Sequence, residues 1–276
     1  MFEHTGKGQD AGPLAQVTGE YLERPAPRSL RDSFACVWTH RMPLAPVRQV
    51  VIVPDATIDL QWLDGKFRIA GPDSFVQQEI VAAGATVVGF RFRPAVATAW
   101  LGASAEEFRD RRVALEDIWG MKARNMAAAV RDHLEAEGIV GAIEAVLARF
   151  GPECAAADAA MRAAYTLVAE GPPSGIPLVP WLGRALGMSE RTLRRRFDES
   201  FGYGPKTLDR ILRHQRFLRL AGTEGVSTAM LAAEAGYSDQ AHLVRESRRL
   251  TGSTPLELRR ALRADACHRP SAINSC

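Results

Sequence analysis

The order of apolar and polar residues divides the chain into a strand-rich first part and a helix-rich remainder. Between residues 34 and 92, short apolar or alternating runs are separated by turn residues, a pattern typical of β-strands. The runs cover residues 34–38, 47–53, 56–63, 66–69, 74–80 and 86–92. An Asp-Gly pair at 64–65 lies between two of these runs and predicts a tight hairpin. Short strands at this even spacing predict an antiparallel barrel or sandwich.

After Pro94 the apolar residues recur at helical spacing. A short helix is expected over 95–101, and Ser104 with Glu107 three residues later predicts a capping box. Longer helices are expected over 121–135, 139–150 and 155–169. The first two carry narrow apolar stripes made of Ala127, Val130, Leu134, Ile143, Val146 and Leu147. These stripes fit either the β-rich part of the same chain or a second subunit.

A motif of about 24 residues occurs twice in the C-terminal part. The first copy spans 182–205 and the second spans 231–255. The two copies are offset by 49 residues up to Ser189 and Ser238 and by 50 after them, so the second copy holds one extra residue. Each copy predicts a helix, a turn and a helix, in which Gly187 or Gly236 ends the first helix and the serine caps the second.

The second helix of each copy has one apolar edge and one polar or basic edge. In the first copy Leu193 and Phe197 are four residues apart, and Arg191 and Arg195 lie on the opposite side with Arg194 beside them. A helix of this kind fits the DNA major groove, where arginine bonds guanine in a bidentate manner. The alternative is a solvated basic face on an ordinary helical hairpin. The repetition favours the DNA interpretation.

Two segments carry a specific resemblance. Gly-Tyr-Ser-Asp-Gln at 236–240 and Arg-Leu-Thr-Gly-Ser-Thr-Pro at 249–255 resemble the AraC/XylS family of bacterial transcriptional regulators over residues 174–263. The resemblance implies two helix-turn-helix units joined by a long helix over 205–221. It places the DNA contacts on Arg191, Thr192, Arg194, Arg195, Gln240, Ala241, His242, Arg245 and Arg248. Ser247 stands where the family usually has phenylalanine, which predicts a weaker core in the second unit.

The same resemblance implies that the first part of the chain is a cupin-like effector-binding domain. Residues 53–55, 71–72 and 89–94 resemble an uncharacterised subgroup of such domains. Candidate effector contacts are Trp38, Trp62, Arg91 and Arg93. The two arginines alternate on one strand, so they either point inward and clamp an anionic ligand or point outward as surface charges. We favour the outward orientation for the arginines and a core position for the tryptophans.

Composition and charge narrow the class of function. The chain of 276 residues is 46% hydrophobic and 24% charged, which is ordinary for globular domains. Residues 174–265 carry 16 lysines and arginines against 10 acidic residues, whereas residues 1–173 carry 18 against 22. A basic C-terminal part beside an acidic N-terminal part indicates a nucleic-acid partner for the former.

Catalytic and metal-binding patterns are missing from the sequence. The six histidines are isolated, and no nucleophile elbow, phosphate loop or dinucleotide fingerprint occurs. The sequence therefore predicts no enzyme, metal or cofactor. The triplet Cys267-His268-Arg269 resembles the alkyl-acceptor cysteine of Ada-type repair proteins, which leaves a repair enzyme as one alternative and a ligand-free architectural DNA binder as another.

Four widely spaced cysteines and the lack of a leader-like segment or an apolar run of about 18 residues predict a reduced, cytoplasmic protein without a membrane partner. The expected fold is α+β, with an antiparallel cupin-like barrel, flanking helices and an all-α double helix-turn-helix. The expected segments are an arm (1–30), an effector domain (31–120), a helical dimerisation region (121–170), a linker (171–175), a DNA-binding domain (176–263) and a tail (264–276). The expected partners are double-stranded DNA, a small-molecule effector, RNA polymerase and a second copy of the chain.

Overall fold

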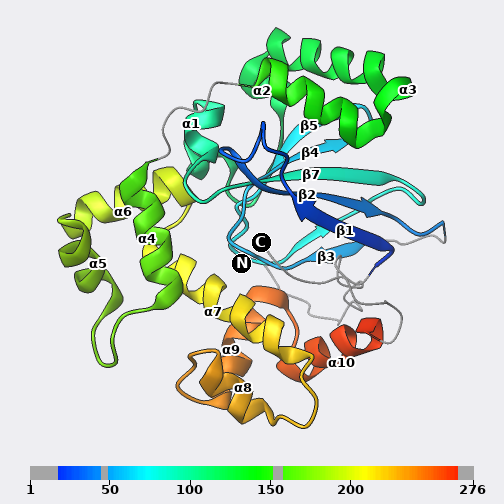
Figure 1. Ribbon diagram of the computed structural model, residues 1–276. Coiled ribbons are helices and arrows are strands. Elements are labelled where there is room, and N and C mark those ends of the chain that lie inside the picture. Colours follow the sequence, from blue (N-terminus) through cyan, green and yellow to red (C-terminus); the bar gives the residue numbers. More distant parts are fainter. Residues whose placement is uncertain (1–17, 45–48, 152–157, 267–276) are drawn as a thin grey trace, which may run out of the picture.

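The computed structural model describes residues 18–44, 49–151 and 158–266. Figure 1 shows a central β-layer, with helix α3 covering one side and a group of smaller helices on the other. The α+β class predicted from the sequence is confirmed.

The β-layer consists of a six-stranded and a two-stranded antiparallel sheet. The larger sheet has the order β1-β2-β7-β4-β5-β8, and β3 pairs with β6. The strands are β1 (Glu20–Pro25), β2 (Phe34–Arg41), β3 (Val50–Ile52), β4 (Asp59–Leu63), β5 (Lys66–Ala70), β6 (Gln77–Glu79), β7 (Thr86–Phe92) and β8 (Arg112–Ala114). The larger sheet is open, with β1 and β8 at its edges, so the barrel expected from the strand spacing is not closed.

The predicted hairpin at Asp64-Gly65 joins β4 to β5. Both residues have positive φ angles, 51° and 77°, which the tight hairpin turn requires. Strand β8 was not expected, because three residues between two helical turns show no readable alternation.

Residues 18–30, the described part of the expected arm, lie against the sheet. β1 pairs with β2 along its whole length, and Leu30 is buried against the sheet core. This edge strand is largely exposed and carries charged residues, so its sequence lacks the alternation of apolar and polar residues that indicates a strand.

Helices cover the sheet on one face. These are α1 (Ala97–Leu101), the 3-10 helix η2 (Ala105–Phe108), α2 (Leu115–Trp119) and α3 (Met121–Phe150). The capping box of Ser104 and Glu107 is present, and α3 is interrupted at Gly138, between the two helices that the sequence predicted.

The apolar stripes of α3 pack on this sheet. Val130 and Ile143 are fully buried in the same cluster as Phe34 and Phe90. Of the two partners left open by the sequence, the structure places the stripes against the β-layer of the same chain.

The remaining helices form the C-terminal domain. They are α4 (Ala159–Glu170), α5 (Leu178–Leu186), α6 (Glu190–Phe201), α7 (Pro205–Ala221), α8 (Thr228–Glu234), α9 (Gln240–Thr251) and α10 (Pro255–Ala266). The connecting helix α7 has the predicted bounds. Met161 of α4 is buried with Leu182 and Phe197, so α4 packs with the first helix-turn-helix unit. The segment 171–175, expected to link the domains, therefore joins two helices of the C-terminal domain.

Helix α10 reaches into the segment expected to be a tail. The Cys267-His268-Arg269 triplet lies outside the described residues. No helix in the described ranges is long and apolar enough to cross a membrane.

The contacts between the two domains include the end of α6 and the middle of α7. At the end of α6, Arg109 Nη1 donates a hydrogen bond of 3.0 Å to the carbonyl oxygen of Gly202. At the middle of α7, Gln215 Nε2 donates a bond of 2.7 Å to the carbonyl oxygen of Pro54. Val51 and Val53 extend the second contact, because they are buried in one cluster with Phe217 of α7.

Candidate DNA-binding surface and N-terminal cavity

Capping side chains fix the start of each second helix. Ser189 Oγ accepts a hydrogen bond of 3.2 Å from the backbone N–H of Thr192, as the sequence predicted. In the second unit the cap is Asp239, whose carboxylate accepts a bond of 2.6 Å from the N–H of His242. The prediction of Ser238 as the cap was wrong, because the extra residue of the second copy lies in the turn and moves the cap one position on.

Helix α6 presents a basic edge to solvent. Arg191, Arg194 and Arg195 are exposed, while Leu193 and Phe197 are fully buried. Arg194 pairs with Glu190 at 3.8 Å and Arg195 with Glu199 at 2.5 Å. Exposed pairs of this kind contribute about 0–1 kcal/mol, so these arginines can exchange their partners for a base or a phosphate.

Two other residues of α6 behave differently. The Thr192 hydroxyl accepts a hydrogen bond of 3.0 Å from Ser189 and is part of the cap. Arg196 is paired with Asp158 at the start of α4, so it ties α6 to the domain and leaves the exposed edge to the other arginines.

Helix α9 presents a more mixed edge. Gln240, Ala241, Arg245 and Arg248 are exposed. His242 is half-buried against the edge of Tyr237, with ring centroids 5.2 Å apart. The second unit therefore offers an amide, an imidazole and two guanidinium groups for DNA contacts.

Ser247 fills a fully buried position on the inner side of α9. Its side chain is 0% exposed, and its hydroxyl has no hydrogen-bond partner among the described residues. A buried unpaired hydroxyl is destabilising. This agrees with the weaker core expected where the family usually has phenylalanine.

The four arginines of α7 differ in their availability to phosphates. Arg210 pairs with Glu246 at 3.4 Å, and Arg213 pairs with Asp209. Arg219 is exposed and Arg216 half-buried. Arg210 thus links α7 to α9, whereas the pair of Arg213 with Asp209 lies within α7.

A cavity of about 120 Å³ lies in the N-terminal domain, lined by both sheets. Trp38 and Arg91 line it, so this arginine points inward while Phe90 and Phe92 pack into the core beneath the helices. Arg93 is exposed and donates to the carbonyl oxygen of Arg31. Trp62 packs on Phe67 in the helix-side core, with ring centroids 4.8 Å apart. The structure therefore brings together two of the four candidate effector contacts.

Arg91 is held in the cavity by three carboxylates. Its guanidinium lies 3.3 Å from both Asp55 and Asp59, and 3.5 Å from Glu23. Burial opposes the charge of the Arg91 guanidinium, but Asp59 and Asp55 outweigh it and raise the pKa of Arg91. Trp38 Nε1 donates to Asp59 at 3.0 Å, which joins the two candidate residues through one carboxylate.

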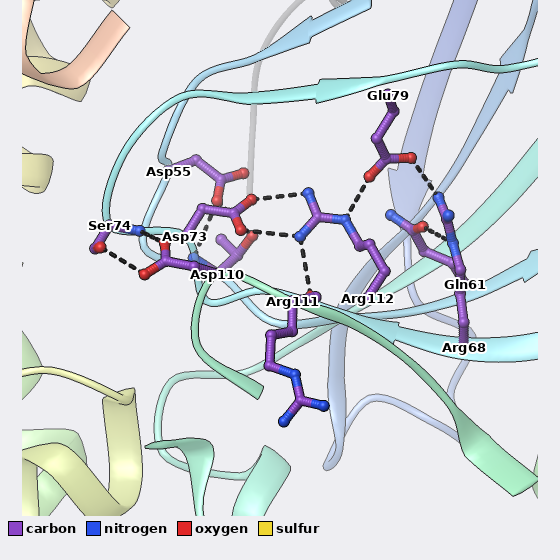
Figure 2. A network of polar contacts seen from close by, with 10 residues as sticks. Asp55, Gln61, Arg68, Asp73, Ser74, Glu79, Asp110, Arg111 and Arg112 are labelled. Carbon is purple, nitrogen blue, oxygen red and sulfur yellow. Dashed lines mark hydrogen bonds and ion pairs between the residues drawn. The ribbon is translucent and has the colours of Figure 1, made fainter. Parts of the chain in front are cut away.

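A second ion-pair network, shown in Figure 2, lines the cavity. It was not predicted from the sequence. Arg112 makes two hydrogen bonds of 2.9 Å to Asp73 and also bonds Glu79. Arg68 bonds Glu79 at 2.7 Å and Gln61 at 2.8 Å. Burial raises the pKa of Glu79, but Arg68 and Arg112 outweigh it and hold that pKa below its usual range.

The residues of this network come from β4, β5, β6, β8 and the loop after β5. No local pattern joins positions so far apart. They meet through the pairing of β4, β5 and β8, the loop after β5 and the position of the two-stranded sheet beside the larger one. A metal site is not formed, because the described residues contain no group of three His, Cys, Asp or Glu side chains that could hold an ion.

Comparison with known proteins agrees with this geometry. A family model described as a helix-turn-helix domain matches residues 182–261. Except for the start of α5, the matched residues contain both helix-turn-helix units that the structure shows, α5–α6 and α8–α9. A model described as a domain of unknown function (DUF6597) matches residues 22–114, which cover all strands of the β-layer except the first two residues of β1.

Solved structures similar to parts of the chain include two proteins described as AraC-type or AraC family transcriptional regulators. One, from Chromobacterium violaceum, is 26% identical in sequence. The match covers 37% of this chain and 88% of that protein's chain, with a TM-score of 0.33. A probable AraC family transcriptional regulator from Rhodopseudomonas palustris is 27% identical. The match covers 37% of this chain and 96% of that protein's chain, with a TM-score of 0.33. An apo ToxT variant from Vibrio cholerae is 11% identical and covers 87% and 100%, with a TM-score of 0.48. No curated protein matches the chain.

Proposed function

We propose that this protein is a sequence-specific, DNA-binding transcriptional regulator and not an enzyme. The observation that supports this most strongly is the exposure of the predicted base-reading side chains on both α6 and α9, each opposite a buried apolar edge. Arginine contacts to phosphates supply salt-dependent affinity, and contacts to base edges supply specificity. The nine predicted DNA contacts named from the sequence are the residues that carry this function.

The rivals are a repair enzyme that uses the same DNA module and an architectural DNA binder. They differ from a regulator in where the protein acts on the chromosome. We expect fragments of genomic DNA from the source organism that bind the protein to lie upstream of transcription start sites, and deletion of the protein to change transcription of the adjacent genes. Binding spread evenly over the genome, without effects on neighbouring transcripts, would support an architectural role.

We also propose that the N-terminal cavity binds a small-molecule effector. Segment 50–57 has cavity-lining residues, including Asp55 and Thr57, and it also contacts the C-terminal domain. Val51 and Val53 are buried beside Phe217 of α7. Helix α7 joins the two DNA-reading units and packs against segment 50–57. A ligand that moves this segment therefore changes the packing of the helix that connects both units.

A homodimer and a contact with RNA polymerase follow from the resemblance to AraC/XylS regulators, and a cytoplasmic location follows from the wide spacing of the cysteines. All three stay proposals. The apolar stripes of α3 do not support the dimer, since they are buried against the sheet.

A further inference from the structure

We propose that the N-terminal cavity takes a small organic cation with N–H donors, of the alkylammonium class. This inference rests on the proposal that the cavity is the effector site. The cavity restricts ligand size, charge and hydrogen bonding, and each restriction can be read from a different set of residues.

Size limits the enclosed part of the ligand. The cavity volume is about 120 Å³. A protein cavity of about 150 Å³ accommodates benzene. The enclosed part of the ligand therefore has about four to six heavy atoms, which excludes a nucleotide or a long acyl chain from the enclosed space.

Charge disfavours an anion. Three arginines and four carboxylates line the cavity among the described residues, namely Arg68, Arg91, Arg112, Asp55, Asp59, Asp73 and Glu79. Each arginine already contacts at least one of these carboxylates. An anionic ligand would have to displace a buried carboxylate from its arginine, which costs free energy because the carboxylate would lose its partner.

Hydrogen-bonding capacity favours a donor. An ionised carboxylate has about four acceptor sites. Asp59 accepts from Trp38 Nε1 and Arg91 Nε, and Asp73 accepts two bonds from Arg112. Arg112 in turn uses its Nε and both terminal nitrogens in hydrogen bonds. Asp59 and Asp73 therefore keep acceptor capacity that an N–H donor of a ligand can use.

The negative charges of the lining are also incompletely compensated. Burial raises the pKa of Asp59 and the pKa of Asp73, in spite of the arginine beside each. A ligand that brings a positive charge and N–H donors to these carboxylates stabilises their ionised forms.

Asp55 and the aromatic pair mark where the cation would lie. Asp55 is the most accessible of the four carboxylates, with 33% of its side chain exposed. Tyr21 and Trp38 stack at a centroid distance of 5.9 Å and line the same cavity. Their π-systems add attraction for an alkylammonium group. Because Asp55 follows Pro54, which contacts α7, a cation bound here acts on the segment that meets the DNA-binding domain.

The test compares three probes of similar size and different charge: propylammonium chloride, 1-propanol and sodium propionate, at equal ionic strength. Binding to the full chain is measured by isothermal titration calorimetry and by thermal shift. We expect propylammonium to bind and to raise the melting temperature with concentration, and the other two to bind at least about tenfold more weakly, because a charge-assisted hydrogen bond is lost. Preferred binding of propionate, equal binding of propanol, or binding of none of the three overturns the proposal.

Variants locate the site. Asp55→Asn should weaken propylammonium binding about tenfold. Asp64→Asn, in the exposed β4–β5 turn, is the matched control and should leave binding unchanged. Asp59→Asn is the second variant, with circular dichroism to establish that it folds. Equal affinities of the Asp55→Asn and Asp64→Asn proteins would show that the cation binds elsewhere.

The same proteins separate the two proposals. DNA binding is measured in parallel by fluorescence anisotropy on a duplex selected from random DNA. Specific DNA binding without propylammonium binding rejects the ligand class and leaves the regulator. Propylammonium binding without specific DNA binding rejects the regulator and leaves the cation site.

Discussion

At the scale of single residues, we propose that the exposed arginines of α6 determine which base pairs the first unit reads. Arg195 is exposed and held only by an exposed pair with Glu199. We expect Arg195→Ala to weaken binding to the selected site by about 1–3 kcal/mol and to relax discrimination at one base pair. Fluorescence anisotropy against the selected duplex and its single-base variants measures both effects.

The control for this prediction is Arg162→Ala. Arg162 is an exposed arginine of α4, outside both reading helices. Its replacement by alanine removes the same charge as Arg195→Ala. It should change DNA affinity little. An equal loss for Arg195→Ala on selected and random DNA would mean that Arg195 contacts only phosphates.

His214 gives the C-terminal domain a pH dependence. It is 0% exposed, stacks on Phe217 at 5.7 Å and has no hydrogen-bond partner among the described residues. Burial lowers its pKa from 6.5 to about 4. The unfolded chain takes up a proton below about pH 6.5, whereas the folded chain resists it until about pH 4. Stability is therefore lost as the pH falls through this window.

We expect His214 to lower the free energy of unfolding by about 2 kcal/mol between pH 7 and pH 5. His214→Leu should remove this part of the pH dependence. Urea unfolding of both proteins at the two pH values measures the change in the free energy of unfolding. Subtracting the change in the His214→Leu protein removes the contribution of other titrating groups such as Asp59. The same pH dependence in both proteins would contradict the neutral, buried histidine.

The sequence predicted residue roles well where a local pattern determines exposure. Opposite helix edges follow from a spacing of three or four residues, so the exposed arginines and the buried Leu193 and Phe197 could be assigned. The outward orientation favoured for Arg91 was wrong, because alternation gives two faces of a strand and does not say which face lines a cavity. The partners of Arg112 lie in the loop after β5 and on the second sheet, and no short pattern predicts such contacts.

At the scale of elements, the one-residue difference between the two units lies in the turn before α9. Asp239 accepts the N-terminal hydrogen bond of this helix, while Ser238 donates its hydroxyl to the Asp239 carboxylate. The hydrogen bond from the N–H of His242 lowers the pKa of Asp239. The position of the cap fixes where the DNA-reading edge of α9 begins.

We expect Asp239→Ala to destabilise the second unit by about 1 kcal/mol, the usual loss for an N-cap. Ser238→Ala should cost less, since Ser238 does not cap the helix. Ser189→Ala, at the cap of α6, is the matched control in the first unit. Thermal unfolding of the three variants ranks their losses of stability. A larger loss for Ser238→Ala than for Asp239→Ala would contradict the assignment of Asp239 as the N-cap of α9.

Most elements could be predicted from periodicity and end signals. The hairpin at Asp64-Gly65, the capping box at Ser104 and the break in α3 at Gly138 all have local residue signatures. The edge strands β1 and β8 could not be predicted, because β1 is largely exposed and β8 has only three residues. A strand of this kind is defined by its neighbour in the sheet.

At the scale of the whole molecule, the end of α6 rests on the N-terminal domain. Gly202 has a φ of 77°, and a Cβ atom there would lie 2.6 Å from Pro72 Cγ and 2.9 Å from the oxygen of Ala105. Gly187 has a φ of 63°, but no described atom lies within 4 Å of its Cβ position. The two glycines share the backbone requirement and differ in the contact between domains.

We expect both Gly187→Ala and Gly202→Ala to lose about 1 kcal/mol of stability from the left-handed backbone. Only Gly202→Ala should also loosen the contact between the domains. Small-angle scattering and limited proteolysis should then show a larger radius of gyration and faster cleavage for this variant alone. Identical behaviour of the two variants would contradict the docked arrangement.

The double helix-turn-helix domain was predictable as a whole because the chain repeats it, and the repeat carries its own turn and cap signals. The contact between the domains was not predictable. Arg109, Pro54 and Gln215 have no sequence feature that pairs them, and the linker expected at 171–175 lies within the C-terminal domain. Long-range packing of this kind follows from the folded shapes of both parts.

The central claim is that two units of one chain read DNA sequence. The most direct measurement is selection of bound sites from random duplex DNA at two salt concentrations. We predict an enriched motif with two blocks about one helical turn apart, and an affinity that falls as salt rises. Salt-dependent binding without any enriched sequence would contradict the claim.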